Sequence, residues 1–441
     1  MADAPNVVFF FSDQQRWDTC GCYGQRVDVT PNLDRMAAEG TRFEHAFTCQ
    51  PVCGPARSAL QTGKYPEAVG CWRNNIHLPL DEKTIAHWFT EWGYQTAYVG
   101  KWHLASGPEP ERNYREEPVP RELRGGWDWW CASDVLEFTS HSYDGHMFRG
   151  DGSVYEFPEG RYRVDAVTDP AIEFLQSRDD RPFFLFVSYI EPHHQNDHNR
   201  YEGPHGSDER WADYDVPGDL EGTEGDWREN FPDYLGCCNA LDGALGRIRD
   251  ELTDQGIGDE TLVIYTSDHG SHFRTRNAEY KRACHDGCLR IPMVACGPGF
   301  TGGRVVEELV SLIDVPPTFL QAAGIPVPDV YHGRALQPLV DGSAQDWPRE
   351  VFAQISESQT GRCVRTDRST YSVSIPERQR ASEVYYEEYL YDNQADPHQR
   401  TNLVLDPQYA GVRAELRETL LRRMAEAGER MPVTIAPARD A

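Results

Sequence analysis

Four apolar segments of the chain are each followed by side chains that could bind a metal ion or an anion. Each segment has the composition of a short buried strand. Residues 7–11 precede Asp13 and Gln14, residues 95–99 precede Lys101 and His103, residues 182–190 precede His193 and His194, and residues 261–266 precede Asp268 and His269. Ligands of open α/β sheets bind beyond the carboxyl ends of the strands, so we expect these side chains in one shared site.

The residue types in this set indicate the chemistry of the site. Oxygen and nitrogen ligands for a divalent cation are offered by Asp13, Gln14, Asp268 and His269. Donors to an anion are offered by Lys101, His103 and His193. A metal ion beside such donors implies an anionic ester as the substrate.

A short motif, Cys53-Gly54-Pro55-Ala56-Arg57, supplies a candidate nucleophile. Pro55 is suited to begin a helix that Gly63 ends, which predicts an exposed Cys53 at the helix N-terminus and Arg57 one turn later. Both side chains could then face one anion. A thiolate nucleophile is an alternative interpretation of the same cysteine.

The elements that position these residues follow from the hydrophobic pattern. Over the first three hundred residues, short apolar runs alternate with helix-period segments, which predicts a mostly parallel sheet with helices on both faces. Helices are expected at about 30–38 and 85–92. The segments 107–160 and 195–226 show neither period and are expected to be insertions or active-site loops.

The pattern changes after about residue 346. Short antiparallel strands are expected at 351–355, 361–366, 370–375 and 387–391, followed by a helix at about 407–427. We therefore predict an α/β catalytic domain over 1–345 and a smaller α+β subdomain over 346–441.

The amino-acid composition argues against two classes of binding partner. The 441 residues include 43 Lys and Arg against 71 Asp and Glu, a net charge of -28, which argues against binding to nucleic acid or to an anionic membrane. The first residues lack a basic region, and their apolar run is too short for a signal peptide, so a cytoplasmic protein is expected. Most of the twelve cysteines are accordingly expected to be reduced and buried.

Taken in order, the motifs resemble those of the type I sulfatases of the alkaline-phosphatase-like superfamily. The resemblance covers nearly the whole chain and rests on Asp13-Gln14, Thr30-Pro31-Asn32-Leu33-Asp34, the Cys53 motif, Gly100-Lys101-Trp102-His103, Pro192-His193, Ser267-Asp268-His269-Gly270, Arg290-Ile291-Pro292, Pro317-Thr318 and Tyr391-Asp392. It implies a large mixed, mostly parallel sheet flanked by helices, with a smaller C-terminal α+β subdomain that contains an antiparallel sheet.

The resemblance also implies a role for each candidate residue. In that family the signature cysteine, here Cys53, is oxidised to formylglycine, whose hydrated aldehyde is the nucleophile. The implied metal ligands are Asp13, Gln14, the modified Cys53, Asp268 and His269, with Ca²⁺ as the usual ion. Mg²⁺ or Mn²⁺ stays possible because Gln14 and His269 coordinate through neutral atoms.

The remaining implied roles concern the ester. Arg57 corresponds to the residue that holds the aldehyde hydrate, and His103 to the one that assists its regeneration. Lys101, His193 and Lys281 correspond to the groups that bind the sulfate and the leaving oxygen. Substrate contacts are also considered for His285, Asn75 and His194, for which ordinary loop, turn or supporting roles are the alternative.

The implied reaction is hydrolysis of a sulfate monoester, of a sulfated carbohydrate or a small alcohol, to the alcohol and inorganic sulfate. Maturation would need a formylglycine-generating enzyme as a partner. Two alternatives stay open. One is a phosphonate monoester hydrolase or phosphodiesterase of the same superfamily, and the other is a non-catalytic sulfate-ester binding protein in which Cys53 stays unmodified.

Overall fold

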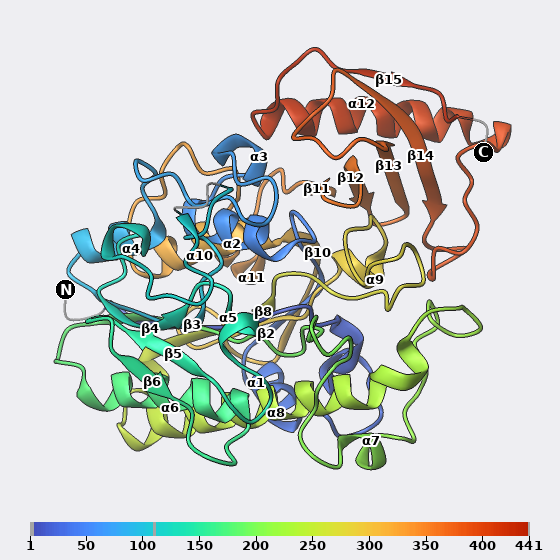
Figure 1. The fold of residues 1–441 in the computed structure, drawn as a ribbon. Helices are drawn as coiled ribbons and strands as arrows, with labels where there is room; N and C mark the ends of the chain where they lie inside the picture. Colours follow the sequence, from blue (N-terminus) through green and yellow to red (C-terminus); the bar gives the residue numbers. More distant parts are fainter. Residues whose placement is uncertain (1–3, 109–111, 440–441) are drawn as a thin grey trace.

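The computed structural model describes residues 4–108 and 112–439 and contains two sheets (Figure 1). In the ten-stranded sheet, β9 and β5 run antiparallel to both neighbours and the other neighbouring pairs are parallel. The strand order is β10 (Arg304–Ser311), β2 (Thr41–Phe47), β9 (Met293–Cys296), β8 (Thr261–Ser267), β1 (Asn6–Ser12), β7 (Phe183–Ser188), β3 (Gln95–Lys101), β4 (Trp129–Ser133), β5 (His146–Arg149) and β6 (Val154–Glu156). The predicted mixed, mostly parallel sheet is confirmed.

Helices cover both faces of this sheet (Figure 1). One layer contains α2 (Cys53–Thr62), α4 (Ile85–Glu91) and α10 (Val315–Ala322), and the other contains α1 (Pro31–Glu39), α6 (Arg163–Ser177) and α8 (Trp227–Asp254). Because side chains alternate along a strand, β1 contributes to the hydrophobic core on both faces.

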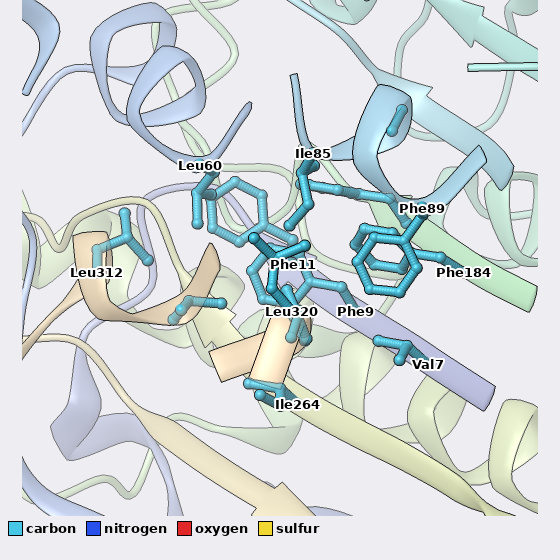
Figure 2. Close-up of a cluster of buried hydrophobic side chains, with 14 of the residues drawn as sticks. Val7, Phe9, Phe11, Leu60, Ile85, Phe89, Phe184, Ile264, Leu312 and Leu320 are labelled. Atoms are coloured by element: carbon cyan, nitrogen blue, oxygen red, sulfur yellow. The ribbon is translucent and has the colours of Figure 1, made fainter. Parts of the chain in front are cut away.

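Figure 2 shows the core on the α2 and α4 side of the sheet. Phe9 and Phe11 of β1 pack there in one cluster with Leu60, Phe89 and Leu320 from the helices above the sheet. The even-numbered residues of β1, Val8 and Phe10, belong to the cluster on the opposite face. Burial on both faces holds the central strand in place. The residues that follow the strand are thereby positioned as well.

The second sheet is formed by the C-terminal part of the chain. Its order is β11 (Glu350–Ile355), β12 (Thr360–Thr366), β13 (Ser369–Ile375), β14 (Val384–Asp392) and β15 (Thr434–Ala436), antiparallel except for the β14 and β15 pair. α12 (Ala410–Glu426) packs on it through Leu416, Leu420 and Met424. The short helices are α3 (Pro66–Val69), α5 (Leu136–Thr139), α7 (Ser207–Arg210), α9 (Asp286–Leu289) and α11 (Gln337–Asp341). The division at residue 345 stays a prediction.

The segment 107–160 differs from its predicted irregular structure, because β4, α5, β5 and β6 lie within it. Four of the five residues of β4 are buried, so the strand shows no alternation of apolar and polar residues. β5 and β6 are too short to show a period. The segment 195–226 is irregular apart from α7, as expected.

None of the helices in the described residues combines the length and the apolar character needed to cross a membrane.

Candidate active site

The carboxyl ends of four adjacent strands of the large sheet meet at one place. β8, β1, β7 and β3 are consecutive neighbours and run parallel. Asp13 and Gln14 follow β1, Lys101 ends β3, His193 lies beyond β7, and Asp268 and His269 follow β8. The structure thus brings the polar residues after all four strands to one edge of the sheet, where they are buried.

Cys53 enters this place from α2, but it is not exposed as we expected. α2 begins at Cys53, two residues before the predicted start at Pro55, and ends at Gly63, whose positive φ of 67° suits a glycine. The Cys53 side chain is only 1% exposed. It is covered because His269 and Lys281, from distant parts of the chain, close over it.

The contacts of the Cys53 sulfur define the centre of the site. Lys281 Nζ lies 2.8 Å from Sγ, Asp13 Oδ1 lies at 3.3 Å and His269 Nε2 at 3.4 Å. Burial and the Asp13 carboxylate raise the pKa of the Cys53 thiol to about 12. The thiol therefore stays protonated near neutral pH.

Asp13 is held between two buried cations. Its Oδ2 lies 3.0 Å from Arg57 Nη2 and 2.9 Å from Lys101 Nζ. Burial opposes ionisation of Asp13, but the Lys101 ammonium and the Arg57 guanidinium lower its pKa well below the ordinary value. Asp13 is therefore a carboxylate. Arg57 also donates to the Lys101 carbonyl oxygen at 2.9 Å and so connects α2 to the end of β3.

Glu137 was not among the residues identified from the sequence. Its Oε2 lies 3.0 Å from Lys101 Nζ, opposite Asp13, and its Oε1 accepts from Asn196 at 3.3 Å. Glu137 belongs to α5, in the segment that the pattern left irregular. No local motif distinguishes it, so only the fold reveals this contact.

The expected metal ligands fit a divalent cation. Single ligand atoms of Asp13, Cys53, Asp268 and His269 lie within 4.8 Å of one another. Asp268 Oδ2 is buried without a hydrogen-bond partner among the described residues. Burial and the neighbouring Asp13 raise the pKa of Asp268 to about 7, and a cation bound between the two carboxylates would favour ionisation of both.

Gln14 is the remaining expected ligand, and the orientation of its side chain is fixed by other residues. Its Nε2 donates to Tyr201 Oη at 2.6 Å and lies 3.3 Å from Ser271 Oγ. The amide oxygen is consequently left buried and without a partner in the described structure. His269 is oriented similarly, because its Nδ1 donates to the Gly270 carbonyl at 2.9 Å and leaves Nε2 as an available lone pair.

His193 and Lys281 form a pair beside the Cys53 sulfur. His193 Nδ1 lies 2.7 Å from the His194 carbonyl oxygen, which can only accept, so the proton resides on Nδ1. His193 Nε2 is then the acceptor for Lys281 Nζ at 3.1 Å. Burial, Lys281 and Lys101 lower the pKa of His193 well below its usual value, so His193 is neutral and Lys281 carries the charge.

His103 lies beside the start of α2. Its backbone nitrogen donates to the Asp134 carbonyl oxygen at 2.6 Å, and its φ is 59°. A Cβ built on Gly54 would lie 3.4 Å from the His103 carbonyl oxygen. Burial and Lys101 lower the pKa of His103 well below the ordinary value, and its Nδ1 has no partner among the described residues.

The three further residues considered as substrate contacts lie in different surroundings. His285 Nε2 is 3.0 Å from Tyr391 Oη, so the imidazole contacts the C-terminal sheet. His194 is buried and stacks on Tyr280, with 4.8 Å between ring centroids. Asn75 is half-buried, and its neighbour Asn74 accepts from the Gly54 backbone nitrogen at 2.8 Å.

Models of known protein families match most of the chain. The family model Sulfatase matches residues 5–325, and the model N-sulphoglucosamine sulphohydrolase, C-terminal, matches residues 278–426. The chain therefore belongs to the sulfatase family, whose members are sulfuric ester hydrolases, and this activity is assigned to it.

Similar proteins cover nearly the whole chain. An ulvan-active sulfatase of Formosa agariphila is 29% identical over 440 residues, 96% of this chain and 82% of the relative. Human arylsulfatase A is 30% identical over 80% of this chain and 71% of its own length. The crystal structure of the candidate sulfatase yidJ from Bacteroides fragilis has a TM-score of 0.85 at 26% identity and covers 97% of both chains. The alkaline-phosphatase-like fold class is thereby confirmed.

Proposed function

We propose that the chain hydrolyses the sulfate monoester of a carbohydrate to the free alcohol and inorganic sulfate, through a formylglycine made from Cys53. The observation that carries the proposal is the environment of the Cys53 sulfur, with Lys281 at 2.8 Å and Asp13 at 3.3 Å. Formylglycine at this position supplies a hydrated aldehyde, one hydroxyl of which attacks sulfur while the other later expels sulfate.

The residues around Cys53 support the binding of an SO₃ group. Lys101 and Lys281 are buried cations, so they can neutralise sulfate oxygens in a site that excludes water. Lys281 donates a proton to the departing alcohol, and His193 Nε2 holds the ammonium in position. Arg57 fixes Asp13, and His103 is the proposed proton acceptor when sulfate is released.

We further propose that the cation is Ca²⁺, held by Asp13, Gln14, Asp268 and His269 together with the modified Cys53. Oxygen atoms from Asp13, Gln14 and Asp268 favour a hard cation. Bound there, the ion supplies positive charge that activates the nucleophile and balances the two carboxylates. Mg²⁺ or Mn²⁺ is the alternative, because two of the ligands are neutral.

The proposal that the substrate is a carbohydrate sulfate is supported by the similarity to the ulvan-active sulfatase. The rival thiolate mechanism, in which Cys53 stays a cysteine, is distinguished from the formylglycine mechanism by the mass of residue 53. The phosphonate or phosphodiester reaction and the non-catalytic binding function are distinguished by experiment.

Protein produced together with a formylglycine-generating enzyme is assayed with Ca²⁺ on sulfated mono- and oligosaccharides, alkyl sulfates, phosphate diesters and phosphonate monoesters. We expect the highest kcat/KM on a sulfated saccharide. Dominant activity on a diester or phosphonate would overturn the proposed reaction, and preference for alkyl sulfates would overturn the substrate class. Binding of sulfated saccharides without turnover, by protein that contains formylglycine, would indicate the binding function.

A further inference from the structure

A second cluster of metal-binding side chains shares no residue with the cluster around Cys53. His141 follows α5, and Asp197 and His198 lie in the loop after β7; one ligand atom of each lies within 4.8 Å of the others. His141 Nε2 is 2.8 Å, and His198 Nε2 is 3.8 Å, from the same oxygen, Asp197 Oδ2. Atoms bound at about 2.0–2.2 Å to one tetrahedral ion lie roughly 3.3–3.6 Å apart. The 2.8 Å separation at His141 is shorter than that range, and the 3.8 Å separation at His198 is longer.

The other nitrogen of each imidazole faces a carboxylate. His141 Nδ1 lies 3.3 Å from Asp144 Oδ1, and His198 Nδ1 lies 2.6 Å from Glu202 Oε1. A carboxylate behind a histidine is the usual support of a metal ligand, because it fixes the proton on one nitrogen and leaves the other as a lone pair. Here both Nε2 atoms lie toward Asp197, and His141 Nε2 donates to Asp197 Oδ2, so an ion that binds there would replace this proton.

The surroundings also suit a cation. The two histidines line an open surface pocket of about 480 Å³, whose wall includes Asp144, Glu202, Asp208 and Asp233 but also Arg200. The imidazole rings are parallel within 10°, with 4.5 Å between centroids. Their side chains are 40% and 42% exposed, so a rotation of each ring can turn both Nε2 atoms onto one ion without movement of the buried core.

We propose that His141, Asp197 and His198 form a second cation site, for Zn²⁺ or a chemically similar transition-metal ion. Two imidazole nitrogens and one carboxylate oxygen suit Zn²⁺, whereas the oxygen-rich site at Asp13 suits Ca²⁺. Three protein ligands leave a fourth position for water or for a group of a bound molecule. The site does not depend on the reaction at Cys53, so its test is independent of the proposed function.

The test is a calorimetric titration of the full chain with ZnCl₂ in excess Ca²⁺, repeated with Co²⁺ to record the visible absorption of a tetrahedral site. We expect one more bound equivalent in the unmodified sequence than in the His141→Ala/His198→Ala double variant. Each single variant should weaken binding about tenfold or more. His205→Ala is the matched control, since His205 lines the same pocket and should leave binding unchanged.

Thermal unfolding in the presence of Ca²⁺ verifies that the variants are folded. The proposal is overturned if the double variant binds Zn²⁺ with the same stoichiometry and affinity as the unmodified sequence. It is equally overturned if His205→Ala weakens binding as much as the single variants do, because binding would then reflect general surface histidines.

Discussion

The ammonium nitrogen of Lys281 lies 2.8 Å from the sulfur of Cys53, although 228 residues separate the two in the chain. Lys281 reaches this place from the segment between β8 and α9, while Cys53 begins α2. A buried cation in contact with the signature residue is suited to charge that develops on a sulfate ester during its cleavage.

Lys281→Ala should lower kcat more than it raises KM, because the lost donor acts on charge that grows in the transition state. The expected loss is about 2.7–4 kcal/mol, or roughly a hundredfold to a thousandfold in rate. Steady-state kinetics on a sulfate monoester measure it. Lys83→Ala is the control, since Lys83 is partly exposed and pairs with Glu91. Equal loss of rate in both variants would contradict the role of Lys281.

Arg57→Ala should destabilise the fold. Its guanidinium and Asp13 are both buried, and removal of Arg57 leaves the Asp13 carboxylate with Lys101 as its remaining cation, so we expect a cost near the lower end of about 3–5 kcal/mol. Urea unfolding at fixed Ca²⁺ measures the change. Arg26→Ala, which removes a solvent-exposed pair with Asp215, should leave the free energy of unfolding nearly unchanged. A free energy of unfolding for Arg57→Ala equal to that of the unmodified sequence would refute this account of Arg57.

Tyr201→Phe should weaken the binding of the active-site cation about 10- to 100-fold, because Gln14 loses the hydroxyl that orients its amide oxygen. Activity as a function of free Ca²⁺ after chelation measures the affinity. Tyr94→Phe is matched in chemistry but removes a hydrogen bond to Pro5, at the opposite end of β1. An unchanged Ca²⁺ dependence in Tyr201→Phe would argue against Gln14 as a ligand.

Glu137→Gln should strengthen inhibition by inorganic sulfate. The carboxylate shares the Lys101 ammonium with Asp13 and repels an incoming anion. Its neutralisation should lower the inhibition constant about 3- to 10-fold, equivalent to about 0.7–1.4 kcal/mol. Glu156→Gln, at an exposed position of β6, is the control. Weaker inhibition by sulfate in Glu137→Gln would show that the carboxylate supports anion binding instead.

The sequence predicted the central strands and the residues after them because burial on both faces leaves continuous apolar runs. Residues 7–11 are such a run, and Asp13 follows it after Ser12, the last residue of β1. Where a buried segment has no regular hydrophobic pattern, its secondary structure was not predicted. β4 combines tryptophan, cysteine and alanine with no alternation, so neither the strand nor Glu137 beyond it could be identified.

Features of the site that depend on contacts between distant residues could not be predicted from the sequence either. Cys53 was expected to be exposed because its own helix does not cover it; Lys281 and His269 do. The motif containing Gln14 indicated a ligand but not its orientation, which depends on Tyr201, 187 residues away. Residue type and local spacing predicted which residues come together in the site, and the tertiary fold determines how their side chains are directed.

The most direct test of the account is mass spectrometry of residue 53 combined with turnover. After tryptic cleavage, residues 43–57 form one peptide that contains both Cys49 and Cys53, so fragment ions can compare the two. We predict that Cys53, but not Cys49, is converted to the lighter formylglycine. We also predict that kcat rises in proportion to the converted fraction and that Cys53→Ala is folded but inactive. Full turnover by protein with unmodified Cys53, or by Cys53→Ala, would contradict the formylglycine mechanism.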